Sequence, residues 1–210
     1  MKTVHVAAYD LLADWEVGAA IAHINHNVNL QREPGSFQVR TVGPSAEAVT
    51  TMGGMRVVPE MALADLDPAD SALLILPGSA LWDEGGLGEF AAAARRFLDA
   101  GVPVAAICGA TAGLAREGLL DDRKHTSGAA EYLAYSGYAG GDSYVEEAAV
   151  TGGDLITAGP TAPWEFAREI FAKLDLYEPH ILDAWYRLFA KSDASAFPVL
   201  VEQEAKAAAS

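Results

Sequence analysis

The segment VPVAAICGATAGL, residues 102–114, decides the fold prediction for this chain. An apolar run ends at Cys108, and small residues follow it. This order is typical of a nucleophile elbow, in which a buried strand turns sharply into a helix and lifts the nucleophile to the carboxyl edge of a sheet. The positions two residues before and after the nucleophile must be small, and they hold Ala106 and Ala110.

Cys108 is the only cysteine of the chain, and its position predicts a reactive thiol. A thiol at the first turn of a helix lies near free backbone N–H groups and the positive end of the helix dipole, which favour the thiolate. The alternative is an inert cysteine that fills space in the core, the common role of a lone cysteine. The small residues on both sides of Cys108 favour the reactive interpretation.

The composition predicts one globular domain over residues 1–210. Of the 210 residues, 51% are hydrophobic, which is enough for one large core. A single cysteine excludes an intramolecular disulfide and a zinc site built on several cysteines. The chain leads from Met1 directly into a predicted strand, and no run approaches the roughly 20 apolar residues that cross a bilayer. We expect a cytoplasmic protein.

The charge of the chain argues against two classes of partner. The formal net charge of −15 comes from 29 acidic and 14 basic residues. Such a surface repels phosphate backbones and anionic lipids, so we expect neither a nucleic-acid partner nor a membrane partner. The sequence also lacks the spacings of common metal ligands and of glycine-rich phosphate loops, so we expect no metal and no cofactor.

Short apolar runs alternate with longer helical patterns, which predicts an α/β fold with a mostly parallel sheet and helices on both faces. Strands are predicted at 3–9, 37–42, 72–76 and 102–107, with a small hairpin at 48–51 and 55–58 and a strand pair at 144–150 and 155–158. Helices are predicted at 14–26, 87–100, 110–116, 128–135 and 163–174, with an amphipathic segment at 179–190. The alanine-rich end from 202 to 210 is expected to fray.

Parallel sheets bind ligands outside the carboxyl ends of their strands. Three loops are expected to meet there: residues 10–16 after the first strand, residues 77–79, and the elbow at 108–111. We expect Ser79, Thr111 and Trp15, which lie in or beside these loops, to contact a substrate. For Trp15, and for Trp82 beside the second loop, packing under the loops is the alternative.

Glu16 begins a helix after the first strand, so its carboxyl group can reach back toward the elbow. A protonated Glu16 would stabilise a thiolate by a hydrogen bond, whereas an ionised one would disfavour it. The alternative is that Glu16 or Asp14 serves the N-terminus of its own helix. Backbone N–H groups of Gly78 and Gly109 are predicted to form an oxyanion hole.

A thiolate enzyme often uses a histidine as proton carrier. His125 follows the elbow helix within a polar stretch, and it is predicted to turn inward as a third catalytic member. A solvent-facing loop histidine is the alternative, because Arg123 and Lys124 precede it.

Together these residues resemble the ThiJ/PfpI superfamily, the class I glutamine amidotransferase-like group that includes the Parkinson-associated protein deglycase. The resemblance covers about residues 4–176. Four motifs carry it: Ala-Asp-Trp-Glu ending at Glu16, Leu-Pro-Gly at 76–78, Ala-Ile-Cys-Gly-Ala at 106–110, and His-Thr-Ser at 125–127.

The resemblance implies a three-layer, flavodoxin-like sandwich, commonly as a homodimer. The segment from about residue 178 lies beyond it and is expected to form a C-terminal helical extension of the single domain. It also implies that Cys108 is the reactive group and Glu16 its hydrogen-bonded partner. Protease-like members carry a histidine directly after the nucleophile, where this chain has Gly109, so peptidase activity is not expected. The late His and Glu pair of true amidotransferases has no matching pattern, because Glu178 and His180 lie in the extension.

These features predict a cysteine-dependent hydrolase or lyase-type enzyme acting on a small carbonyl, amide or nitrile-like substrate. Cys108 would be the nucleophile, and Glu16 would hold or move its proton. The alternative is a protein of the same superfamily without turnover, either a chaperone-like protein or an oxidative-stress sensor in which Cys108 is oxidised to a sulfinic acid.

Overall fold

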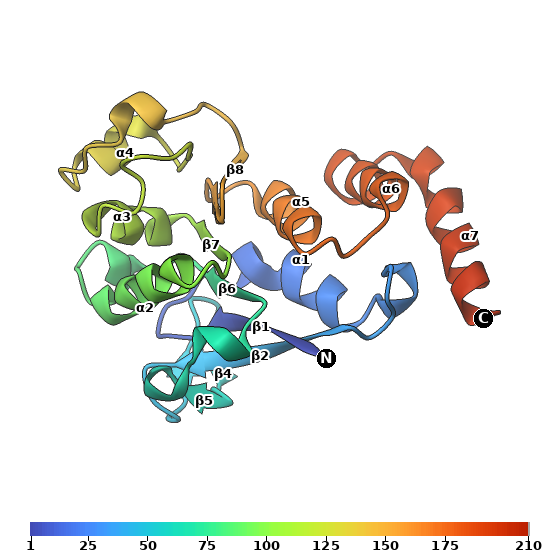
Figure 1. Ribbon diagram of the computed structural model, residues 1–210, viewed down its shortest axis with the longest axis horizontal. Coiled ribbons are helices and arrows are strands. Elements are labelled where there is room, and N and C mark those ends of the chain that lie inside the picture. Colours follow the sequence, from blue (N-terminus) through green and yellow to red (C-terminus); the bar gives the residue numbers. More distant parts are fainter. Residues whose placement is uncertain (210) are drawn as a thin grey trace.

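A computed structural model describes residues 1–209, and over this range a seven-stranded sheet lies between two layers of helices (Figure 1). The strand order is β5-β2-β1-β6-β7-β9-β8, and every neighbouring pair is parallel except β8 with β9. Its strands are β1 (Lys2–Ala7), β2 (Phe37–Gly43), β5 (Met61–Ala62), β6 (Leu73–Leu76), β7 (Val104–Ile107), β8 (Ala149–Gly152) and β9 (Leu155–Ala158). A separate antiparallel hairpin pairs β3 (Val49–Thr50) with β4 (Arg56–Val57).

Helices connect the strands and cover both faces of the sheet. The α-helices are α1 (Asp14–Asn25), α2 (Gly88–Asp99), α3 (Gly109–Arg116), α4 (Ala130–Ala134), α5 (Pro163–Lys173), α6 (Pro179–Lys191) and α7 (Phe197–Ala208). Short 3₁₀ helices are η1 (Val28–Leu30), η2 (Leu63–Asp65), η3 (Pro68–Asp70), η4 (Ala80–Trp82), η5 (Gly141–Ser143) and η6 (Ala194–Ala196). None of the described helices is both long and apolar enough to cross a bilayer.

Alternate residues of the central strands belong to two different cores. In β6, Leu74 and Leu76 pack in the core under α2 and α3, whereas Leu73 and Ile75 pack in the core under α1 and α5. Figure 1 shows these two helix pairs on opposite sides of the strands. A strand that is buried on both faces reads as a continuous apolar run, which is why β6 and β7 could be located from sequence. The predicted three-layer, flavodoxin-like α/β fold is confirmed.

Most predicted elements are confirmed, and the main differences lie at the edges of the sheet and at the end of the chain. The strand predicted at 144–150 starts only at Ala149, and the edge strand β5, two residues long, was not predicted. The expected fraying from residue 202 is wrong as far as Ala208, because α7 continues to that residue. Alanine has the highest helix propensity, and Leu200 anchors the helix with 5% exposure; Ser210 lies outside the described residues.

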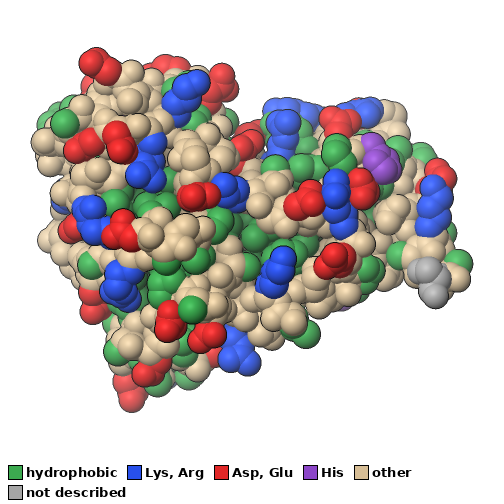
Figure 2. Space-filling model, in the orientation of Figure 1, with side chains coloured by type: hydrophobic (Ala, Val, Ile, Leu, Met, Phe, Trp, Pro, Cys, Tyr) green, Lys and Arg blue, Asp and Glu red, His purple; other side chains and the backbone are tan. Residues whose placement is uncertain are grey.

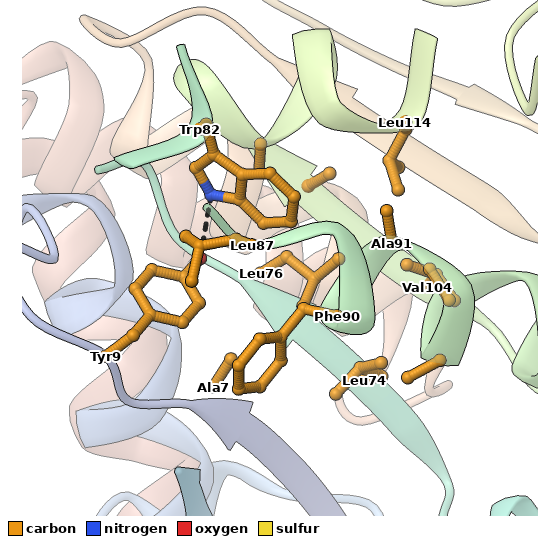
Figure 3. Packing of buried hydrophobic residues seen from close by; sticks show 14 of the residues in the cluster. Ala7, Tyr9, Leu74, Leu76, Trp82, Leu87, Phe90, Ala91, Val104 and Leu114 are labelled. Carbon is orange, nitrogen blue, oxygen red and sulfur yellow. Dashed lines mark hydrogen bonds between the residues drawn. The ribbon is translucent and has the colours of Figure 1, made fainter. Parts of the chain in front are cut away.

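A buried aromatic platform lies under the carboxyl ends of β1 and β6. The Trp82 indole N–H donates to the Tyr9 hydroxyl and to the Pro77 carbonyl, each at 3.0 Å, and the Tyr9 hydroxyl donates to the same carbonyl. Figure 3 shows Trp82 and Tyr9 with Leu76 and Phe90 beside them. A Cβ on Gly113 would lie 2.2 Å from the Trp82 ring, so only glycine fits there. The platform therefore fixes the loop after β6.

The outer surface carries both signs of charge. On the face shown in Figure 2, Asp and Glu side chains are interspersed with Lys and Arg side chains. The C-terminal helices α6 and α7 lie beyond the sheet, at the end of the molecule where Figure 1 marks the C-terminus. Trp185 and Ile181 of α6 are buried against the same core as α1 and α5.

Candidate active site

Cys108 sits at the turn between β7 and α3 in a strained backbone conformation. Its φ of 57° and ψ of −127° are unusual for a residue other than glycine. Contacts on both sides hold the turn: the Cys108 N–H donates to the Ala158 carbonyl at 3.0 Å, and the Thr111 hydroxyl donates to the Cys108 carbonyl at 2.6 Å. Ala106 and Ala110 are fully buried, as the nucleophile elbow requires.

Glu16 reaches the elbow from the first turn of α1. Its side chain is fully buried, and its Oε2 accepts a hydrogen bond from the Gly78 N–H at 2.6 Å. The N-terminus of α1 has no side-chain cap, and Asp14 instead accepts from the Gly53 N–H at 2.6 Å. Glu16 therefore does not serve its own helix; it joins α1 to the loop after β6.

Gly78 brings the carboxyl group and the thiol together. A Cβ on Gly78 would lie 2.7 Å from Glu16 Oε2, 2.7 Å from Cys108 Cβ and 3.0 Å from Cys108 Sγ. Only a residue without a side chain leaves room for both groups. Among the described residues, the other carboxylate oxygen of Glu16, Oε1, is buried without a hydrogen-bond partner.

The electrostatics of the two groups depend on each other. Burial raises the pKa of Glu16, because the charged carboxylate loses its hydration. Burial and the neighbouring Glu16 carboxylate raise the pKa of Cys108 to about 12, and the Gly109 N–H only partly opposes this by its hydrogen bond to the sulfur. The helix N-terminus was expected to favour the thiolate, but burial and Glu16 outweigh it and favour the protonated thiol.

A cavity of about 340 Å³ opens beside Cys108. Its walls come from all three predicted loops and from the loop after β9, which contributes Pro160. The residues that line it are Ala13, Trp15, Glu16, Met52, Gly78, Ser79, Ala80, Asp83, Cys108, Gly109, Gly128, Tyr132 and Pro160.

The predicted substrate-contacting residues occupy different places. Trp15 stands half exposed at the cavity, and its indole N–H donates to the Pro160 carbonyl at 3.2 Å. Ser79 lines the cavity, but its hydroxyl donates to the Asp10 carbonyl at 2.9 Å. Thr111 is fully buried behind Cys108 and bonds to the Cys108 carbonyl and to Ser127, so it holds the elbow and is not part of the lining.

Two of the predicted catalytic contributions need correction. His125 is fully buried away from the cavity lining: Nδ1 lies 2.9 Å from the Arg123 carbonyl and Nε2 lies 3.0 Å from the Tyr138 hydroxyl. A parallel bridge to Tyr144 fixes its backbone. The Gly78 N–H is bonded to Glu16, so it is not a free oxyanion donor, and of the predicted pair only Gly109 directs its N–H at the sulfur.

Tyr132 and Asp83 were not singled out from the sequence. The Tyr132 hydroxyl, on α4, donates to Asp83 Oδ1 at 2.6 Å, and both residues line the cavity. Neither belongs to a predicted strand end, so no local signal marked them. Within residues 1–209, no group of three His, Cys, Asp or Glu side chains is arranged to hold a metal ion.

The family model that matches the chain is the DJ-1/PfpI family, over residues 2–173. A Bacillus subtilis protein named uncharacterized protease YoaZ is 37% identical over 189 residues, which cover 89% of this chain and 90% of that protein. A second, named uncharacterized protease YdeA, is 33% identical over 187 residues, covering 87% and 88%.

Two solved structures share the fold at high similarity. The ThiJ/PfpI family protein from Bacillus anthracis has a TM-score of 0.91 at 36% identity, covering 97% of this chain and 98% of that one. A DJ-1 superfamily protein from Agrobacterium tumefaciens has a TM-score of 0.80 at 32% identity, covering 91% and 99%. Motifs, fold and relatives agree, and the chain belongs to the DJ-1/PfpI family.

Proposed function

We propose that this protein is a cysteine-dependent hydrolase or lyase-type enzyme for small carbonyl, amide or nitrile-like compounds, with Cys108 as nucleophile. The observation that carries the proposal is the buried pair at Gly78: the Glu16 carboxyl group and the Cys108 thiol both approach the Gly78 Cβ position, they share a side-chain hydrogen bond, and the thiol faces an open cavity. A carboxyl group in this place can accept the proton of the thiol.

The first step is addition of the thiol to the substrate. The thiol proton moves to Glu16 as the sulfur forms a bond to the electrophilic carbon. For a carbonyl substrate, the C=O electron pair shifts to oxygen, and this oxygen then takes the proton back from Glu16. The raised pKa of Glu16 makes it a stronger base than an exposed carboxylate, and the Gly109 N–H stabilises negative charge on the sulfur.

Peptidase activity is not part of the proposal, although the two Bacillus subtilis relatives are named proteases. The residue after the nucleophile is Gly109, His125 is bonded elsewhere, and no histidine lines the cavity. A cavity of about 340 Å³ suits a small molecule.

The test is turnover of a panel containing methylglyoxal, an isonitrile, a glutamine analogue and casein. We expect at least one small electrophile to be consumed by the wild type, with a loss of at least about 100-fold in Cys108→Ala and Glu16→Gln at unchanged melting temperature. Casein should not be cleaved. If no small electrophile shows turnover that depends on Cys108, the proposed function is wrong.

A further inference from the structure

The lining of the Cys108 cavity is asymmetric in charge. Its ionisable side chains other than the thiol and the Tyr132 phenol are the carboxyl groups of Glu16 and Asp83, and it contains no Lys, Arg or His. The nearby Arg116 guanidinium donates to the backbone carbonyls of Trp82 and Asp83 and is not part of the lining. A bound carboxylate or phosphate would therefore find no positive side chain in the cavity.

Asp83 acts on the reacting atom at a distance. Its negative charge is among the causes that raise the pKa of Cys108, so it lies within electrostatic range of the sulfur. Its Oδ1 accepts the Tyr132 hydroxyl at 2.6 Å, which holds the carboxyl group at the cavity wall. Asp83 is exposed at the cavity wall, so an anionic substrate approaching Cys108 would meet its negative charge through a repulsion that added salt can screen.

The other walls are mostly apolar and include two large exposed side chains. Trp15 is 52% exposed and Met52 is 49% exposed. The bond from the Trp15 indole to the Pro160 carbonyl holds the ring at the cavity, and Met52 lies in the turn between β3 and β4. A flat apolar group on a ligand would cover both side chains and remove their surface from water.

From these observations we infer that the cavity selects uncharged electrophiles with an apolar, flat substituent, that Trp15 and Met52 receive the substituent, and that Asp83 rejects anionic compounds. The inference rests on the proposed function only in taking Cys108 as the attacking group. Recognition by charge and apolar surface does not depend on which reaction follows.

The test compares rates of Cys108 alkylation by iodoacetamide, iodoacetate and iodoacetanilide at pH 8, followed by intact mass. In each case the sulfur displaces iodide from the CH₂ carbon, and the thiol proton passes to Glu16 or to solvent. Because the chain has one cysteine, the mass increase that is absent in Cys108→Ala reports on Cys108. Rates are divided by those of 2-mercaptoethanol, an uncharged thiol without a binding site.

Relative to 2-mercaptoethanol, we expect iodoacetate to react at least about tenfold more slowly than iodoacetamide, and iodoacetanilide several-fold faster. Asp83→Asn, which keeps an acceptor for Tyr132, should recover most of the iodoacetate reaction. Glu204→Gln, which changes the net charge equally on α7, should change nothing. Trp15→Ala should remove the preference for iodoacetanilide.

A second measurement needs no variant. Raising the salt concentration from about 0.02 to 0.5 M should weaken the discrimination against iodoacetate in the wild type, because added ions screen Asp83. The inference would be overturned if the iodoacetate-to-iodoacetamide rate ratio of Cys108 equalled that of 2-mercaptoethanol. It would also be overturned if Asp83→Asn and the wild type gave the same ratio. Failure of the proposed function looks different: a catalytically silent protein can still show these ratios, since they do not depend on turnover.

Discussion

Helix α1 carries two titratable side chains whose pKa is shifted mainly by burial, Glu16 and His23, and they lie two helical turns apart. Burial raises the pKa of Glu16 and lowers the pKa of His23 to about 4, so in both cases it favours the uncharged form. Their surroundings differ. His23 packs against the edges of Trp185 and Phe189, and its Nδ1 accepts the Trp185 indole N–H at 3.2 Å.

Glu16 has one satisfied oxygen and one buried oxygen without a partner, and it lies beside a cavity and a thiol. Burial shifts the pKa of both residues, but only Glu16 lies beside the thiol and the cavity, where it is available for chemistry. The comparison therefore assigns His23 to stability and Glu16 to reactivity.

The largest expected effect comes from filling the space at Gly78. In Gly78→Ala, the new Cβ would clash with Cys108 and Glu16 at 2.7 Å and separate the two groups. We expect the rate of Cys108 alkylation by iodoacetamide at pH 7 to fall at least about 100-fold. Gly88→Ala is the matched control, because no atom lies within 4 Å of its Cβ position. Equal rates in both variants would show that the contact at Gly78 is irrelevant to reactivity.

His23 is expected to act on stability through pH. The pKa of His23 is lowered from 6.5 to about 4 in the folded protein, so between these pH values the unfolded chain binds a proton that the folded protein does not. Above pH 6.5 this difference has no effect on the free energy of unfolding, but that free energy decreases as the pH falls from 6.5 toward 4. Between pH 7 and pH 4 the free energy of unfolding should decrease in both proteins, and the decrease should be about 2 kcal/mol smaller in His23→Phe than in the wild type. Urea titrations at both pH values measure this.

His180→Gln, at an exposed position on α6, is the control for the His23 experiment. It should show the pH dependence of the wild type. A His23→Phe protein with that same dependence would mean that the aromatic cluster does not bias the protonation of His23.

Thr111 is expected to have a moderate effect, because it supports the elbow from behind. Thr111→Val removes the hydrogen bonds to the Cys108 carbonyl at 2.6 Å and to Ser127 at 2.7 Å. The free energy of unfolding should decrease by about 1–2 kcal/mol, with a smaller loss of thiol reactivity than in Gly78→Ala. Thr50→Val, at an exposed position on β3, serves as the control. A loss of reactivity as large as that of Gly78→Ala would place Thr111 in the reacting machinery.

The smallest effect is expected from a substitution at Gly18, which lies on α1 between Glu16 and His23. Gly18 has no atom within 4 Å of its Cβ position, so Gly18→Ala should raise the free energy of unfolding by about 0.5–1 kcal/mol through helix propensity. Thiol reactivity should not change. A change in reactivity would show that the rigidity of α1, and not only the position of Glu16, controls the pair.

The sequence predicted those parts of the site that depend on backbone pattern. Cys108 follows an apolar run and is flanked by small residues, and Glu16 follows the first strand by a short loop, so the parallel topology brings them to one edge. Gly78 was assigned to the correct loop but to the wrong partner, because which acceptor a backbone N–H meets depends on side-chain packing.

His125 turns inward as predicted, but it does not reach the Cys108 cavity, and the reason is comparable. Its position after α3 allowed either direction, and long-range contacts with Tyr138 and Tyr144 decided it. Asp83 and Tyr132 lie 49 residues apart and show no local pattern, so only the folded chain places them together. The helical end of α7 was missed because the alanine-rich segment after residue 202 does not show that Leu200, earlier in the same helix, packs in the core.

The central claim is that Glu16 and Cys108 share one proton, and the pH dependence of Cys108 alkylation by iodoacetamide tests it most directly. The account predicts a nearly constant rate from about pH 6 to 9 in the wild type, because the thiol proton moves within the pair, and a rise of about tenfold per pH unit over this range in Glu16→Gln. A wild-type rate that rises about tenfold per unit, in parallel with Glu16→Gln, would contradict the account.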